Sequence, residues 1–106
     1  MTKSRQQQIE EMLKTEPSDS FLNYALALEF AKSDDLKKAI ELIELLLLRD
    51  ANYLGAYYQL GRYYEQTGQL QNAINSYKKG ILIAQQQKDR KTLGELNEAL
   101  MALQDE

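Results

Sequence analysis

The sequence contains no cysteine and no histidine. Without cysteine there is no disulfide and no thiol chemistry, and without histidine the commonest general base and metal ligand is missing. The N-terminus has no stretch typical of a signal peptide, and the longest apolar run, Leu45 to Leu48, is far too short for a membrane span. We therefore expect a cytoplasmic protein with no metal, no cofactor and no membrane partner.

Strong charge and catalytic motifs are also missing. The chain carries 13 basic and 16 acidic side chains, and a net charge of −3 is too weak to predict a nucleic-acid partner. There is no phosphate-binding glycine loop, no Gly-x-Ser-x-Gly and no dinucleotide fingerprint. The acidic pairs fall at turns or on exposed faces; they are Glu10–Glu11, Asp34–Asp35 and Asp105–Glu106. General acid–base catalysis needs carboxyl groups that are desolvated in a shared cleft, and this pattern predicts no such cleft. We expect a non-enzyme.

Helix-breaking residues are few, with one proline and five glycines in 106 residues. Apolar residues recur at helical spacing, which predicts an all-α domain. The expected helices are about 4–15, 19–32, 35–49, 53–67, 70–87 and 90–104. Ser18 or Asp19, Asp35 and Asp89 precede three of these helices and are of the residue types that cap helix N-termini.

The chain repeats itself with an offset of 34 residues. The repeat-related pairs are Leu26 and Leu60, Ala27 and Gly61, Phe30 and Tyr64, Leu36 and Leu70, Ala39 and Ala73, and Ile40 and Ile74. Each pair keeps its size class. A helical bundle without internal repeats would show the helical period but not this longer register.

This repeat length and pattern resemble the tetratricopeptide repeat, a helix–turn–helix unit that stacks into an αα superhelix. In the second copy the signature positions hold Tyr57, Leu60, Gly61, Tyr64, Gly68, Ala73, Tyr77 and Gly80. The resemblance implies one domain over residues 1–106. Its expected parts are an N-terminal helix at 4–15, repeats at 20–53 and 54–87, and a capping helix at 90–104.

The first copy departs from the pattern at three positions. Asn23 replaces its aromatic residue, Leu46 its small residue and Asp34 its turn glycine. Because aspartate tolerates a left-handed backbone better than most residues, we expect the turn to be kept. The first copy is therefore a degenerate form of the repeat.

The resemblance also implies a binding surface, because the first helix of each such repeat lines a concave groove that holds a peptide or helix of a partner protein. The corresponding residues here are Phe21, Tyr24 and Leu28, then Tyr58, Arg62 and Glu65, followed on the last helix by Lys91, Gly94, Glu98 and Met101. Helical geometry independently places Tyr58, Arg62 and Glu65 on a face roughly 100° from the core stripe, whereas Tyr57 and Tyr64 belong to the core. The alternatives are a Tyr58 half-buried against a neighbouring helix and an Arg62 that is a plain surface residue.

A second surface is indicated by the run of leucines in ELIELLLLRD. Leu42, Leu45 and Leu48 are not needed for the inward face, and exposed contiguous leucines usually mark an interface, here a homodimer or partner patch. One repeat later, Leu42 and Leu45 correspond to Ser76 and Lys79, which we expect on an exposed side. The alternative is that helix 4–15 or the terminal helix covers these leucines.

We therefore predict a non-catalytic protein–protein interaction module. Two other functions stay open: a homo-oligomeric assembly module that associates through the leucine patch, and a regulatory segment of a larger protein.

Overall fold

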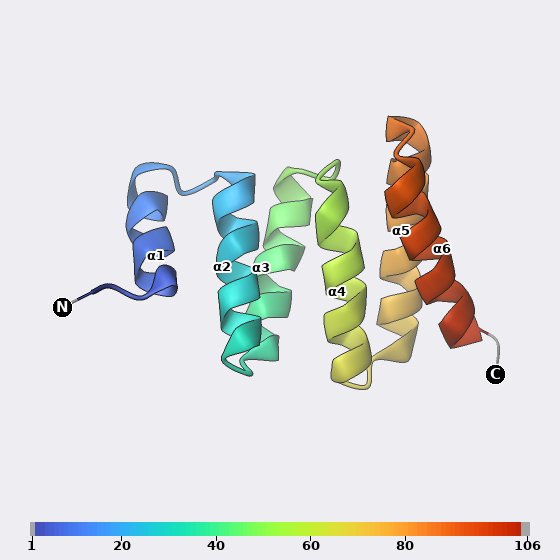
Figure 1. The fold of residues 1–106 in the computed structure, drawn as a ribbon, viewed down its shortest axis with the longest axis horizontal. Coiled ribbons are helices and arrows are strands. Elements are labelled where there is room, and N and C mark those ends of the chain that lie inside the picture. Colours follow the sequence, from blue (N-terminus) through green and yellow to red (C-terminus); the bar gives the residue numbers. More distant parts are fainter. Residues whose placement is uncertain (1, 105–106) are drawn as a thin grey trace. The chain divides into compact units, whose positions relative to one another are not determined.

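The computed structural model describes residues 2–104, so the acidic pair Asp105–Glu106 lies outside the described residues. Within this range the chain forms six α-helices and no strand (Figure 1), which confirms the all-α prediction. The expected helix ends agree with the observed ones to within one residue. No helix among these residues combines the length and the apolar character that crossing a bilayer needs. The chain divides into two compact units, Met1–Ala51 and Asn52–Glu106.

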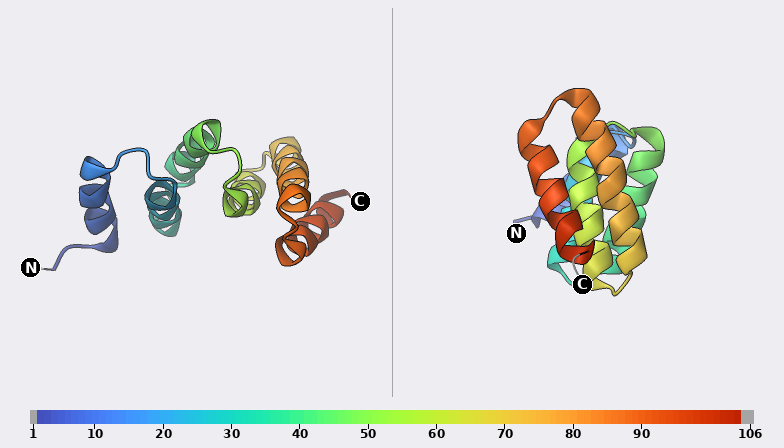
Figure 2. Two further views of the ribbon diagram at one scale, coloured as in Figure 1. Left: turned by 90° about the horizontal axis from the view of Figure 1, so that it is seen from above. Right: turned by 90° about the vertical axis from the view of Figure 1, so that its right-hand side faces the viewer.

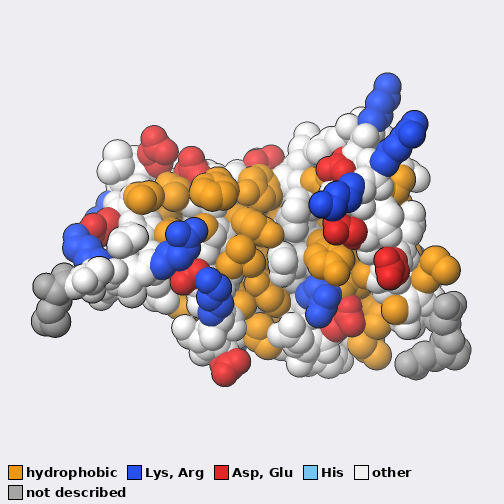
Figure 3. Space-filling view, viewed as in Figure 1, with side chains coloured by type: hydrophobic (Ala, Val, Ile, Leu, Met, Phe, Trp, Pro, Cys, Tyr) orange, Lys and Arg blue, Asp and Glu red, His pale blue; other side chains and the backbone are white. Residues whose placement is uncertain are grey.

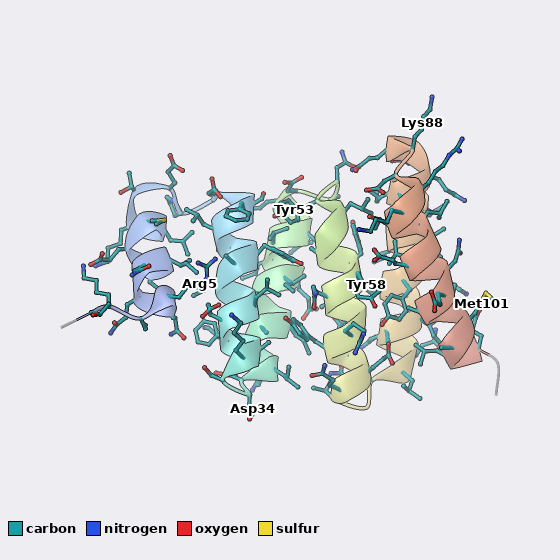
Figure 4. All side chains as sticks on the ribbon, in the orientation of Figure 1. Arg5, Asp34, Tyr53, Tyr58, Lys88 and Met101 are labelled. Carbon is teal, nitrogen blue, oxygen red and sulfur yellow. The ribbon has the colours of Figure 1, made fainter. Side chains whose placement is uncertain are left out.

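The first unit contains α1 (Arg5–Thr15), α2 (Ser20–Lys32) and α3 (Leu36–Arg49). Helix α1 contacts α2, and α2 pairs with α3. The core of this unit includes Ile9, Ala25 and Leu26, with Leu13, Phe30 and Leu42 packed against them. Arg5 projects from α1 toward α2 (Figure 4), and its Nε atom lies 3.6 Å from a carboxylate oxygen of Glu29.

The second unit contains α4 (Leu54–Gln66), α5 (Leu70–Gln87) and α6 (Arg90–Gln104). Helix α5 contacts both α4 and α6, which lie on the same side of it (Figure 2). Two glycines allow these contacts to be close. A Cβ atom at Gly61 would lie 2.2 Å from Cε1 of Tyr77, and one at Gly80 would lie 2.8 Å from Cβ of Tyr57. Any larger side chain at either position would force the paired helices apart.

The same turn ends the first helix of both hairpins. After α4, Gly68 has φ 76°, and the amides of Gly68 and Gln69 donate to the carbonyls of Glu65 and Tyr64. This is the hydrogen-bond pattern of a Schellman motif. After α2, Asp34 has φ 63°, and the amides of Asp34 and Asp35 donate to Ala31 and Phe30. The prediction that aspartate keeps the left-handed turn is confirmed.

The predicted N-caps are also observed. The carboxylates of Asp19, Asp35 and Asp89 accept backbone amides of Leu22, Lys38 and Thr92 at 2.8, 3.2 and 3.0 Å. Between the two N-terminal candidates, the structure therefore selects Asp19 rather than Ser18.

Three of the six pairs related by the 34-residue offset have matching burial. Leu26 and Leu60 are each 7% exposed, and Ala39 and Ala73 are each 0% exposed. Ala27 and Gly61 are both buried. Tyr57 and Tyr64 are buried, as predicted for core residues. These three pairs therefore point inward in both copies, whereas the other three differ: Phe30 is half-buried and Tyr64 buried, Leu36 is half-buried and Leu70 exposed, and Ile40 is buried and Ile74 half-buried.

The expectation for Ser76 is wrong, because this residue is buried rather than exposed. Its hydroxyl donates a hydrogen bond to the carbonyl oxygen of Tyr57 at 2.9 Å. A small hydroxyl side chain can thus be buried at this α4–α5 contact without leaving a polar group unsatisfied. Asn23, at the first unit's departure from the pattern, is also buried, and its Nδ2 donates to the carbonyls of Pro17 and Asp19.

Candidate functional site

Tyr58, Arg62 and Glu65 line one open groove on the second unit. Their spacing of i, i+4 and i+7 places them on the same face of α4. Helix α6 supplies the opposite wall with Glu95, Glu98, Ala99 and Ala102, and the groove has a volume of about 410 Å³. Tyr58 projects from α4 toward α6 (Figure 4). On this face acidic and basic side chains both border an apolar area over the two helices (Figure 3).

Tyr58 has two roles in this groove. Its ring centroid lies 6.1 Å from that of Tyr77 with the planes tilted by 46°, so one side of the ring packs on α5. The residue is half-buried and also lines the groove. Tyr58 is therefore half-buried against a neighbouring helix, which was one alternative, and it also lines the groove.

The guanidinium of Arg62 lies against the same tyrosine. Its Cζ is 6.0 Å from the ring centroid of Tyr58, and its Nη1 donates to the tyrosine hydroxyl at 3.4 Å. The hydrogen bond to Tyr58 is the main cause that raises the pKa of Arg62. The arginine is exposed but held in place by a ring and a hydroxyl, a geometry typical of a weak cation–π contact.

Glu65 is held by Tyr77, a residue that the sequence analysis named only as a signature position of the repeat. Tyr77 on α5 is fully buried, and its hydroxyl donates to the Glu65 carboxylate. Burial, followed by this hydrogen bond, raises the pKa of Tyr77 well above its usual value. The hydroxyl therefore remains a donor at neutral pH and orients the carboxylate at the groove surface. No sequence signal distinguishes this tyrosine from an ordinary core aromatic, because the contact depends on the packing of α4 on α5.

Of the four residues that the sequence predicted for the binding surface of α6, one lines this groove. Glu98 lines it, whereas Lys91, Gly94 and Met101 are exposed and are not among its lining residues. Met101 points away from α4 (Figure 4). Leu96 is fully buried, and its methyl groups lie 3.1 and 3.2 Å from where a Cβ of Gly80 would stand. This contact sets the rotation of α6 and turns Glu95 and Ala99 toward the groove.

The three remaining predicted contact residues belong to α2 in the first unit. Phe21 is 62% exposed and lines a shallow pocket with Met12, Thr15, Glu16, Asp19 and Leu22. Tyr24 and Leu28 are half-buried. Phe21 therefore presents an exposed apolar side chain beside an open pocket.

The leucine patch is covered at one of its three positions. Leu42 is half-buried and packs against the core cluster of Ile9, Ala25 and Leu26. Leu45 and Leu48 are 55% and 83% exposed. Two leucines of α3 therefore remain on the surface.

The side chains of the α4–α6 groove determine which contacts it can make. It offers an aromatic face, hydrogen-bond acceptors on three carboxylates and one guanidinium. Among residues 2–104, no group of three or more His, Cys, Asp or Glu side chains is arranged to hold a metal ion.

Comparison with known proteins gives consistent results. The family model described as tetratricopeptide repeat matches residues 54–87. The crystal structure of a tetratricopeptide repeat domain protein from Salinibacter ruber is 38% identical, covers 82% of this chain and 97% of its own, and has a TM-score of 0.78. A solution NMR structure of such a domain protein from Salinibacter ruber is 39% identical, covers 82% of this chain and 88% of its own, and has a TM-score of 0.79.

A more distant structure shares the fold. The solution structure of a protein from Bordetella parapertussis is 22% identical, covers 98% of this chain and 90% of its own, and has a TM-score of 0.85. Among curated proteins, none matches the sequence.

Proposed function

This chain belongs to the tetratricopeptide repeat family, and we propose that it is a non-catalytic module that binds a peptide or helix of another protein. Folds of this family generally mediate protein–protein interaction. The observation that carries the proposal is the α4–α6 groove, in which Tyr58, Arg62 and Glu65 offer aromatic, cationic and anionic contacts side by side. Amphipathic aromatic residues and arginine are the residue types that dominate protein interfaces.

The proposed mechanism is binding to a surface that is already ordered. Tyr58 packs on Tyr77 and holds Arg62, while the hydroxyl of Tyr77 holds Glu65. Because these side chains are restrained before a partner arrives, little conformational entropy is lost on binding. The partner segment buries apolar surface on the ring of Tyr58, and Arg62 and Glu65 set its orientation through polar contacts. Phe21, Tyr24 and Leu28 on α2 are further proposed contact residues.

Site-specific photo-crosslinking tests this proposal. A benzophenone amino acid at position 58 is expected to crosslink a partner protein in a lysate of the source organism. The same group at position 79, an exposed lysine position on α5 outside the groove, serves as the matched control. A Tyr24→Ala/Tyr58→Ala variant with unchanged helical circular dichroism should lose the partner in a pull-down. Equal crosslinking at both positions, or full retention of the partner by this variant, would contradict the proposal.

Self-association is a second candidate function, and the exposure of Leu45 and Leu48 favours it. Contiguous exposed apolar side chains are uncommon on monomers unless they serve an interface. The two functions are separable, because self-association through α3 should survive the Tyr24→Ala/Tyr58→Ala change.

A further inference from the structure

We infer that the α4–α6 groove takes a basic segment of its partner, one that presents lysine or arginine side chains. This inference rests on the proposed function and names the chemistry of the segment that occupies the groove. It is carried by the charges that line the groove, by their existing contacts and by the space between the two helices.

The walls of the groove carry an excess of negative charge. Among the residues that line it, three are acidic, Glu65, Glu95 and Glu98, and one is basic, Arg62. That guanidinium already lies against the ring and the hydroxyl of Tyr58. An acidic segment would meet three carboxylates and only one cation that is already engaged, whereas a basic segment would be attracted along the whole groove.

The three carboxylates retain free capacity to accept hydrogen bonds. Glu65 accepts one bond from Tyr77, which fixes its position but leaves other acceptor sites unused. Glu95 and Glu98 stand one turn apart on α6, and neither forms an ion pair with another described residue. One oriented carboxylate on α4 thus faces two unpaired ones on α6.

The space between the helices suits long basic side chains. Ala99 and Ala102 contribute only methyl groups to the α6 wall, and the ring of Tyr58 forms apolar surface on the α4 wall. Lysine and arginine combine an aliphatic stem with a charged end, so the stem can lie on apolar surface while the head reaches a carboxylate. Both parts of such a side chain therefore find a matching part of the groove.

The test uses the whole protein and labelled peptides. The probe is a fluorescein-labelled peptide of leucine, alanine and lysine, compared with peptides in which glutamine or glutamate replaces each lysine. We expect anisotropy to show binding of the lysine peptide, weakened by added salt. Glu95→Gln/Glu98→Gln should lower its affinity by about tenfold, as loss of two charge contacts does at interfaces.

A matched control separates the groove from the general charge of the protein. Glu41 and Glu44 have the same spacing on α3, are exposed and carry the same charge. Glu41→Gln/Glu44→Gln should leave the affinity for the lysine peptide unchanged. An equal loss in both double variants, equal binding of the glutamine or glutamate peptide, or no binding of the lysine peptide would overturn the inference.

The failure of this inference differs from the failure of the proposed function. If position 58 captures a partner whose affinity is unaffected by Glu95→Gln/Glu98→Gln, the groove is a binding site but not one for a basic segment. If position 58 captures only a second copy of this chain, the occupant is the protein itself and the inference falls. If position 58 captures nothing, the proposed function fails.

Discussion

At the scale of single residues, side-chain size at the α4–α5 contact is set by the partner across it. Gly61 faces Tyr77, with no room between them for even a methyl group. The corresponding residues of the first unit are Ala27 and Ile43, both fully buried. A larger residue on one helix is thus matched by a smaller one on the other. The family's signature describes each position separately, whereas close packing constrains the combined volume of the two side chains that meet.

Gly61→Ala is expected to lower the free energy of unfolding by about 2 kcal/mol, because its Cβ would overlap the ring of Tyr77. Gly94→Ala is the matched control, because Gly94 is an exposed residue of α6 and no heavy atom lies within 4 Å of the added Cβ. This change should raise the free energy of unfolding by about 1 kcal/mol through helix propensity. Urea unfolding measures both. Equal effects of the two alanines would contradict the close contact.

The raised pKa of Tyr77 predicts a loss of stability in alkali. The unfolded chain releases this proton near pH 10, whereas the folded chain keeps it to higher pH. Above about pH 10 the unfolded state therefore binds fewer protons, and the free energy of unfolding falls as pH rises. Tyr77→Phe removes this titration, so its stability should fall less steeply between about pH 10 and 11.5 in urea titrations. Parallel slopes for the two proteins would refute the role of Tyr77.

At the scale of secondary-structure elements, local signals explain where the helices begin and end. Acidic caps start α2, α3 and α6, and left-handed residues end α2 and α4. The first of these turns departs from the family's glycine without losing its hydrogen bonds, because Asp34 adopts the required φ. Lys88 also has a positive φ, 58°, at the end of α5, which the sequence did not reveal.

Asp34→Gly should raise the free energy of unfolding by about 0.5–1 kcal/mol, because it removes the cost of a left-handed conformation for a residue with a Cβ. Gly68→Ala is the reciprocal change, and it should lower stability by about 1 kcal/mol. Nothing lies within 4 Å of a Cβ at Gly68, so a steric clash cannot account for that loss. Thermal or urea unfolding of both variants tests the pair. A neutral Gly68→Ala would show that the turn does not require this φ.

A second pair of departures is compensated in the same way. Gly80 lies against Tyr57 in the second unit, and the corresponding residues of the first unit are Leu46 and Asn23. Both are buried. The second unit thus combines a large residue, Tyr57, with a glycine, whereas the first unit has two residues of intermediate size at the corresponding positions.

At the scale of the whole molecule, the exposed leucines of α3 are a surface through which two copies could associate. Self-association through the leucine patch predicts a dimer in sedimentation equilibrium that Leu45→Glu converts to a monomer. Leu82→Glu is the matched control, because Leu82 on α5 is 59% exposed, close to the 55% of Leu45. It should leave the dimer intact. A monomeric mass for the parent protein and both variants would eliminate this candidate.

The sequence by itself determined the helices, the turns and the register of the repeat. These features depend on residues a few positions apart, or on a fixed offset that can be read directly along the chain. The same reasoning identified Tyr58, Arg62 and Glu65 as one helical face, since that face follows from helix geometry alone.

Only the tertiary structure decided which residues of α5 and α6 lie next to this face of α4. The burial of Leu96 beside Gly80 set the rotation of α6 and brought Glu95 rather than Lys91 to the groove. The packing of α4 on α5 placed the hydroxyl of Tyr77 against Glu65 and buried Ser76. These outcomes depend on how one helix is rotated against another, which is set by contacts between residues distant in sequence and not by the pattern within either helix.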